Sequence, residues 1–254
     1  MNDGEALLKV SGLRVIYRSP GKKTVEAVKG VSFSIRKGEA LGIVGESGCG
    51  KTSTAKVLTG LEPGSSGEIF FKGTRYSADG RLRLDGVQMV FQDAAGSLNP
   101  RMTIGSALRE ALKVHRVLPH GKIDGRISQL LEMTGLSDKV LGQYPGELSG
   151  GQCQRVSIAR CLSLEPELLI ADEPVSALDV SVQARILNLL KDLRKKLNLS
   201  ILMISHDLAV VRMVCDRICV MHEGNFVECG DAVEVLEHPK HPYTRELLAA
   251  VPRV

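Results

Sequence analysis

The chain has 254 residues, of which 43% are apolar, and its 33 basic and 29 acidic side chains leave a formal net charge of +4. A chain of this length forms one large or two small domains and can build a sizeable core. The weak net charge argues against a DNA-binding protein. An aromatic content of 4% without tryptophan argues against stacking on single-stranded nucleic acid. We therefore expect no nucleic-acid partner.

Strand patterns dominate the first part of the chain. Apolar and polar residues alternate in ALLKVSGLRVIYR and in VSFSIRKGE, which predicts strands of a half-exposed sheet. A continuous apolar run that ends in glycine, ALGIVG, predicts a buried central strand. Another strand is expected at VQMVFQD.

Helical patterns replace the strands between about residues 95 and 160, in IGSALREALKVHR and GRISQLLEMTGL. Strand patterns return in ELLIADEP and SILMISHD, and between them Ile186, Leu190, Leu193 and Leu197 mark one face of a helix. The segment RICVMHEGNFVECG predicts a hairpin with EGN at its turn.

The order of these elements predicts one α/β domain over residues 1–254. Its core, at approximately 1–94 and 161–254, would hold a parallel sheet with crossover helices and an antiparallel layer at the N-terminal end. A helical subdomain at approximately 95–160 would interrupt this core. The last residues, approximately 235–254, would form a separate tail.

The segment GIVGESGCGKTSTAKVL carries the first chemical motif. It fits the pattern G-x-x-x-x-G-K-S/T, and it follows an apolar strand and opens a helix, as this pattern requires. Backbone N–H groups and the helix N-terminus of such a loop surround phosphates, the lysine reaches the β- and γ-phosphates, and the hydroxyl ligates Mg²⁺. We therefore expect ATP and Mg²⁺ as cofactors. The loop residues expected to bind them are Gly45, Glu46, Ser47, Gly48, Cys49, Gly50, Lys51, Thr52 and Ser53.

Two adjacent carboxylates end the apolar run of LLIADEP. Asp172 and Glu173 would lie at the carboxyl edge of a parallel sheet, where ligands bind in such folds. Asp172 is predicted to hold Mg²⁺, directly or through water. Glu173 is predicted to polarise the attacking water.

A second glycine-rich segment, ELSGGQCQR, contains the sequence LSGGQ at Leu148–Gln152. With this motif in place, the chain resembles the nucleotide-binding subunits of ABC transporters over essentially its whole length. The resemblance implies a P-loop NTPase (RecA-like) core with an N-terminal antiparallel β subdomain and an inserted α-helical subdomain. It also implies that Tyr17 stacks on adenine, that Gln92 in VFQD serves catalysis and Mg²⁺, that Asp179 ends the D-loop, and that His206 in ISHD contacts the γ-phosphate.

The resemblance gives the two glycine-rich loops different nucleotides. Two subunits would pack head to tail, with each ATP between the Gly45–Thr52 loop of one and the Ser149–Gly151 loop of the other. ATP binding would close the dimer, and hydrolysis would open it. The signature residues expected at the partner's γ-phosphate are Ser149, Gly150, Gly151 and Gln152. Arg155, one turn inside the following helix, would either support this site electrostatically or be solvated.

Two further segments, GSLNPRMTIG and HPYTRELLAAVP, are similar to the ATPases of oligopeptide, dipeptide and nickel importers. The sequence GESGCGKT and the absence of a cysteine-rich C-terminal extension favour the second of the two ATPase types in such importers. The implied partners are a second ATPase in a heterodimer, or another copy in a homodimer, with two permease subunits and an extracytoplasmic binding protein. The alternative is a soluble ATPase of a phosphonate carbon–phosphorus lyase, which also resembles this branch at HPYT. That tail could equally be a segment that folds back on the core.

No signal-peptide pattern precedes the first strand, and the apolar runs are too short to cross a bilayer. We expect a soluble chain that lies on the cytoplasmic face of the inner membrane through its partners. No C-x-x-C pair is present, so we expect reduced cysteines and no metal site at Cys215 and Cys219. The six cysteines are Cys49, Cys153, Cys161, Cys215, Cys219 and Cys229.

Overall fold

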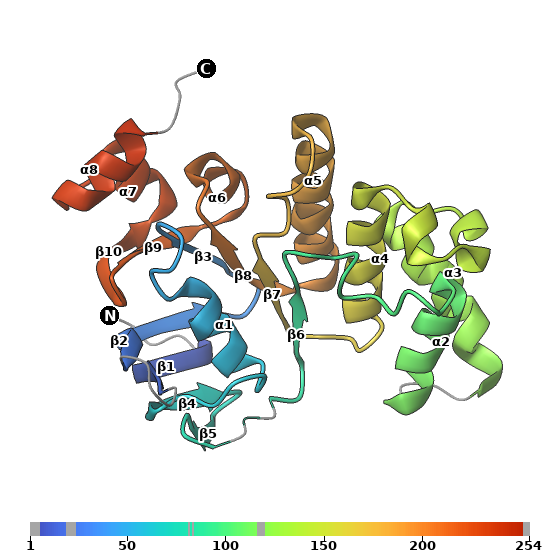
Figure 1. Ribbon diagram of the computed structural model, residues 1–254, viewed down its shortest axis with the longest axis horizontal. Coiled ribbons are helices and arrows are strands. Elements are labelled where there is room, and N and C mark those ends of the chain that lie inside the picture. Colours follow the sequence, from blue (N-terminus) through green and yellow to red (C-terminus); the bar gives the residue numbers. More distant parts are fainter. Residues whose placement is uncertain (1–5, 19–23, 81, 83, 116–119, 251–254) are drawn as a thin grey trace.

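A computed structural model describes residues 6–18, 24–80, 82, 84–115 and 120–250 (Figure 1). The extreme ends, 1–5 and 251–254, lie outside the described residues, so the last part of the expected tail is not placed. In the described part of the chain, no helix combines the length and the apolar character needed to cross a membrane.

A six-stranded sheet with the order β10-β9-β3-β8-β7-β6 forms the centre of the molecule. Its neighbours pair in parallel except for β9 and β10, which are antiparallel. Strands β3, β7 and β8 are buried along their whole length, so the central strand predicted at ALGIVG and the strands predicted at ELLIADEP and SILMISHD are confirmed. The bounds are β3 (Ala40–Val44), β6 (Val87–Val90), β7 (Leu168–Asp172), β8 (Ser200–Ser205), β9 (Arg217–His222) and β10 (Asn225–Asp231).

The N-terminal part forms a separate four-stranded antiparallel sheet with the order β2-β1-β4-β5. This sheet and helix α1 (Lys51–Leu58) contribute to one apolar cluster on one side of the large sheet. The antiparallel layer expected from the alternating segments is therefore confirmed. Its strands are β1 (Ala6–Tyr17), β2 (Val25–Arg36), β4 (Ser66–Phe71) and β5 (Thr74–Ser77).

The large sheet separates two apolar clusters because successive side chains of a strand point to opposite faces. On β3, Leu41 and Ile43 join the cluster with α1, whereas Ala40 and Val44 join the cluster on the other face. Helices α2 to α8 cover this second face or extend from it. Their bounds are α2 (Ile104–Val114), α3 (Ile123–Thr134), α4 (Gly150–Leu162), α5 (Val180–Leu197), α6 (Leu208–Val214), α7 (Ala232–Glu237) and α8 (Pro242–Ala249), with short 3₁₀ turns η1 (His120–Lys122), η2 (Asp138–Gly142) and η3 (Pro145–Glu147).

Helices α2, α3 and α4 stand together beyond β6, on the far side of the sheet edge from the N-terminal strands (Figure 1). The side chain of Thr103 accepts from the Ser106 N–H and starts α2, and Gly135 ends α3 in the left-handed conformation that a helix C-terminus favours. The helices predicted in this segment are present. The subdomain boundaries at about 95 and 160 stay a prediction.

The helix predicted between the two strands is α5, but one of its four marked residues is not part of the core. Ile186, Leu190 and Leu193 are buried, whereas Leu197 is 46% exposed. Leu197 is the last residue of α5, and Asn198 follows in the left-handed conformation. The helix therefore leaves the apolar layer before its final turn.

The hairpin predicted at the C-terminal side consists of β9 and β10. Its turn residues Glu223 and Gly224 both have positive φ, as a type I′ turn requires. Cys219 and Cys229 are opposite each other in this ladder, with Cα atoms 4.1 Å apart, and form a disulfide. The expectation that all six cysteines are reduced is thus wrong for this pair, because the antiparallel ladder of the hairpin places the two side chains next to each other. The free, buried cysteines are Cys49, Cys153, Cys161 and Cys215.

Candidate nucleotide site

The phosphate loop joins the carboxyl end of β3 to the N-terminus of α1. Two of its glycines are required by close approach of the backbone. A Cβ on Gly45 would lie 2.1 Å from the carbonyl oxygen of Met221, and a Cβ on Gly50 would lie 2.3 Å from that of Ala27. Gly50 also has a φ of 113°, which L side chains rarely adopt. The loop is thus packed closely against β2 on one side and the β9–β10 hairpin on the other.

Lys51, the first residue of α1, points back into this loop. Its side chain is nearly buried, and Nζ donates to the carbonyl oxygens of Gly45 and Glu46, both at 2.8 Å. A buried ammonium needs such partners. The carbonyl contacts hold the positive charge within the loop, where the sequence predicts phosphate.

Thr52 and Asp172 meet across the gap between α1 and β7. The Thr52 hydroxyl donates to Oδ1 of Asp172 over 3.3 Å. Asp172 is buried, and this burial is the main cause that raises the pKa of its carboxyl group. The hydrogen bond from Thr52 acts in the opposite direction, and the neighbouring Glu173 charge raises the pKa further. Two of the three predicted Mg²⁺ ligands, Thr52 and Asp172, thus place oxygen atoms side by side.

The carboxylate of Glu173 is held from two sides. Nε2 of Gln92 donates to Oε2 over 3.0 Å, and Nδ1 of His206 lies 3.0 Å from Oε1. These three residues follow β6, β7 and β8, which are adjacent parallel strands, so their carboxyl ends share one edge of the sheet. Three of the four predicted catalytic side chains are therefore in direct contact.

The backbone of Glu173 is itself unusual. Its φ of 46° is in the left-handed region, which is strained for a residue with a side chain. Its N–H donates to the carbonyl oxygen of Ile204 on β8, and its carbonyl accepts from the hydroxyl of Ser176. These bonds stabilise a conformation that turns the carboxylate toward Gln92 and His206.

Tyr17 ends β1 beside helix α1, with 38% of its surface exposed. Its hydroxyl bonds Ser53 at 3.0 Å and also bonds the carboxylate of Glu62. Glu62 in turn forms an ion pair with Lys56 at 2.8 Å. The ring that is expected to stack on adenine is therefore anchored by its polar end.

The signature loop starts helix α4. The side chain of Ser149 accepts from the N–H of Gln152 and caps the helix, while the Gln152 side chain accepts from the N–H of Ser149. A Cβ on Gly151 would approach Val182 of α5 to 2.5 Å, so this glycine is also required by packing inside one chain. The same helix α5 begins after the D-loop residue Asp179, which is its exposed N-cap residue.

The two glycine-rich loops do not meet within one chain. Figure 1 shows α1, which begins at the phosphate loop, on one side of β7 and β6, and α4 on the other side. Helix α4, which the signature loop starts, thus lies apart from helix α1, which the phosphate loop starts. Arg155, further along α4, donates to the carbonyl oxygen of Gly135 at 3.0 Å. It ties α4 to the end of α3 and is therefore not simply solvated, while its electrostatic role at the signature stays a prediction.

Residues 28–176 match the protein family described as ABC transporter. The chain belongs to this family. Residues 227–254 match a second family, described as Oligopeptide/dipeptide transporter, C-terminal region. This ABC protein is thus an ATPase with a P-loop NTPase fold, as the motifs and the resemblance predicted.

Individual relatives support the same assignment. The chain is 45% identical to the oligopeptide transport ATP-binding protein OppF of Haemophilus influenzae, over 99% of this chain and 80% of the relative. It is 48% identical to AppF of Bacillus subtilis, which has the same description, over 90% of this chain and 71% of the relative. A solved dimeric post-hydrolysis structure of the ATP-binding cassette MJ0796, bound to ADP and Pi, aligns with a TM-score of 0.77. That alignment has 27% identity and covers 89% of this chain and 98% of the other.

Two side chains near the site of this ABC ATPase were not predicted. Glu62 anchors Tyr17, but it is part of no recognisable motif, so no sequence signal could have found it. Tyr243 lies in HPYT, a segment that the sequence marked without assigning a contact. Its hydroxyl oxygen is 3.3 Å from the backbone nitrogen of Glu46 in the phosphate loop.

Proposed function

We propose that this ATPase powers an importer for peptides. The observation that carries the proposal is the match of residues 227–254 to the C-terminal region of oligopeptide and dipeptide transporters. The two relatives above are named for oligopeptide transport, which favours peptides over nickel and favours an importer over the carbon–phosphorus lyase alternative. As part of such an importer, the chain would lie on the cytoplasmic face of the inner membrane.

In the proposed reaction, the Glu173 carboxylate accepts a proton from the water that attacks the γ-phosphate. Gln92 and His206 keep this carboxylate in place through its two oxygens. Lys51 would exchange its carbonyl partners for the β- and γ-phosphate oxygens and stabilise the charge that develops there. Tyr17 would orient the nucleotide by stacking on adenine.

Thr52 and Asp172 are the residues that would hold Mg²⁺, with Gln92 at the same edge of the sheet. Their oxygens suit this ion, which prefers carboxylate and hydroxyl oxygen ligands together with phosphate. Among the described residues, no group of three or more His, Cys, Asp or Glu side chains could bind a metal by itself. The nucleotide would therefore supply the remaining ligands. When bound, Mg²⁺ neutralises phosphate charge during phosphoryl transfer.

The proposed working unit is a head-to-tail dimer with two ATP molecules between the subunits. Its support is the separation of α4 from α1 within one chain, because a second subunit can bring the signature loop at the start of its α4 to this chain's phosphate loop. The N-terminus of α4, capped by Ser149, offers N–H groups and a positive dipole end to the partner's γ-phosphate. We propose a heterodimer with a second ATPase type, and a homodimer is the other outcome.

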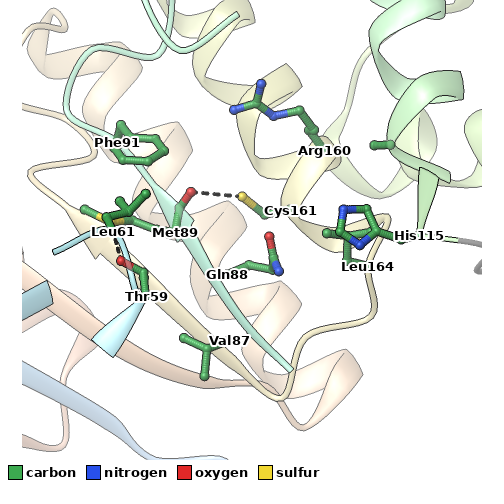
Figure 2. Close-up of a pocket in the computed structure, with 11 residues that line it drawn as sticks. Thr59, Leu61, Val87, Gln88, Met89, Phe91, His115, Arg160, Cys161 and Leu164 are labelled. Atoms are coloured by element: carbon green, nitrogen blue, oxygen red, sulfur yellow. Dashed lines mark hydrogen bonds between the residues drawn. The ribbon is translucent and has the colours of Figure 1, made fainter. Parts of the chain in front are cut away.

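A groove between the core and the helical segment is the proposed contact for a permease. Its volume is about 320 Å³, and Figure 2 shows Leu61 and Phe91 on one side with Arg160 and His115 on the other. Leu61 is 55% exposed although it is a large apolar residue. Phe91 directly precedes Gln92, so a permease helix in this groove would contact the chain next to the catalytic edge. The proposed partners are two such permeases, fed by a binding protein.

A pull-down of the intact chain from its native membrane tests the importer proposal. Recovery of integral-membrane permeases and ATP-driven uptake of a labelled oligopeptide by the reconstituted complex would support it. Recovery of soluble phosphonate-degrading subunits would instead support the lyase. Uptake of nickel without uptake of peptide would overturn the substrate class alone.

Cross-linking tests the groove separately. A cysteine at Leu61, or at Ser97, whose carbonyl accepts from Arg160 at 2.8 Å, should capture the permease. A cysteine at the exposed Arg245 of α8 is the control and should capture less. Capture from position 245 alone would refute the placement of the permease.

A further inference from the structure

The C-terminal tail is fixed against the β9–β10 hairpin. The carboxylate of Glu228 on β10 accepts from the backbone N–H groups of Lys240 and His241, at 2.8 and 3.1 Å. Nδ1 of His241 then accepts from the N–H of Tyr243 and caps helix α8. These bonds place the HPYT segment at a defined position beside the end of β9.

The ring of Tyr243 is buried between this tail and the phosphate loop. Only 8% of the residue is exposed, and its ring stacks on His222, the last residue of β9, with centroids 3.9 Å apart and planes at 25°. Stacking of this kind limits the ring to one position. The hydroxyl oxygen at the end of the ring then accepts from the backbone N–H of Glu46 at 3.3 Å.

One peptide group of the phosphate loop is therefore held at both ends. Its carbonyl, that of Gly45, accepts from Nζ of Lys51, and its N–H, that of Glu46, donates to Tyr243. The rest of the loop contains Gly48 and Gly50, both with positive φ, and glycine allows many other backbone conformations. A hydrogen bond from outside the loop restricts this freedom before the nucleotide arrives.

We propose that Tyr243 is a positioning residue for nucleotide binding, which keeps the Gly45–Glu46 peptide in the orientation that ATP requires. Nucleotide binding would withdraw Lys51 from the Gly45 carbonyl, and from then on Tyr243 is the side chain that still holds this peptide. A loop ordered in advance loses less conformational entropy on binding, so the contact increases affinity for the phosphates. The inference rests on the phosphate-binding role of the loop, which belongs to the proposed function.

Replacement of Tyr243 by Phe tests this inference, because Y243F keeps the stacked ring and removes only the hydroxyl. The KM for ATP and the equilibrium Kd for ATP should rise about three- to ten-fold, the range expected for one lost hydrogen bond. The kcat at saturating ATP should stay within about two-fold, since Tyr243 touches no reacting atom. The matched control is Y76F in β5, half-buried in the other sheet, which should leave both constants unchanged.

Amide hydrogen exchange supplies a direct second readout on the same full-length proteins. The Glu46 N–H should exchange slowly in the nucleotide-free chain and rapidly in Y243F, while amides of the central strands remain protected. A purely structural role for Tyr243 would lower the unfolding temperature and leave KM and Glu46 exchange unchanged. Either that result or an unaltered KM in a well-folded Y243F protein would overturn the inference.

A parallel K51A variant separates this inference from the proposed function. If K51A loses ATP affinity but Y243F does not, only the role of the tail is wrong. If K51A itself binds ATP normally, the loop is not the phosphate site, and the proposed function fails with it.

Discussion

The side-chain amide of Gln92 donates to the carboxylate of Glu173 across 3.0 Å, joining the segments that follow β6 and β7. Gln92 directly follows Phe91, which lines the groove proposed for the permease. A displacement of this segment would therefore move a hydrogen-bond partner of the proposed catalytic base. Through this hydrogen bond, a permease helix that enters or leaves the groove would change the position of Glu173 and with it the rate of ATP hydrolysis.

Replacement of Glu173 by Gln should stop turnover and preserve binding. Glutamine keeps the shape and can still contact Gln92 and His206, but it cannot take up a proton at neutral pH. The rate of ATP hydrolysis should fall by roughly 10² or more, the contribution of a general base, while the ATP Kd remains close to that of the wild type. Steady-state ATPase assays and equilibrium binding measure the two effects. Near-normal turnover in E173Q would remove Glu173 from this role. The control is E165Q, which changes a glutamate that forms an ion pair with Arg126, and it should leave the rate of ATP hydrolysis unchanged.

Replacement of Lys51 by Ala should weaken nucleotide binding itself. The ammonium lies within the phosphate loop, so its loss removes charged hydrogen bonds to the β- and γ-phosphates. The expected decrease in ATP affinity is about ten- to a hundred-fold. A fluorescent ATP analogue measures it by titration. K72A, which removes an exposed lysine paired with Glu167, should bind normally, and equal affinity of the two variants would contradict the assignment.

Replacement of Asp172 by Asn should stabilise the nucleotide-free chain at neutral pH. Burial raises the pKa of Asp172 above 3.8, so its ionisation opposes folding. The free energy of unfolding therefore decreases as pH rises from 3.8 through the raised pKa. Asparagine remains neutral and keeps an oxygen that can accept from Thr52.

Thermal unfolding at several pH values measures this effect. D172N should unfold at a higher temperature than the wild type at pH 7, and the difference should shrink as pH falls toward 3.8. With Mg²⁺ and ATP present, the order should reverse, because the variant loses a metal ligand. A D172N chain that is less stable at pH 7 without nucleotide would show that burial is not the dominant influence.

Mixing two variants tests the proposed head-to-tail site. Ser149→Arg adds bulk and charge next to the partner's γ-phosphate but leaves its own Lys51 intact, whereas K51A has the reverse defect. In a mixed dimer, one composite site carries both changes and the other carries neither. Mixing should therefore restore ATP-dependent dimerisation, measured by light scattering. If the chain does not homodimerise, the two changes are divided between it and its second ATPase.

Ser149→Arg also removes the N-cap of helix α4, so its control must remove a helix cap elsewhere. Ser149 is the N-cap residue of α4, and loss of such a cap costs about 1 kcal/mol. Thr103→Arg removes the equivalent cap of α2 and should leave nucleotide binding and mixing unchanged. Loss of ATP binding by an isolated Ser149→Arg monomer would place the signature in its own chain's site and refute the proposal.

Sequence patterns give the most specific predictions where the atoms of a site come from consecutive residues. A phosphate loop needs its glycines, lysine and threonine at set positions along one turn, so GESGCGKT predicts one from consecutive residues alone. The same holds for the Glu223–Gly224 turn, whose two positive φ values depend on local residues. Glu62 could not be predicted in this way, because its contact with Tyr17 depends on how distant segments pack. The disulfide between Cys219 and Cys229 lies within the predicted hairpin, but the register shift between Phe226 and Glu228 decides which residues are opposite each other.

Sequence by itself determined the fold class, the phosphate-loop motif, and the order in which Gln92, Glu173 and His206 follow apolar strands, because these features depend on local periodicity and spacing. Only the tertiary structure decided that β6, β7 and β8 are neighbours and that both oxygens of one carboxylate are therefore held. It also decided that Tyr243 reaches Glu46 and that α4 stays apart from α1. Hydrophobic patterning selects which face of an element is buried, but the partners it meets depend on how the whole chain packs.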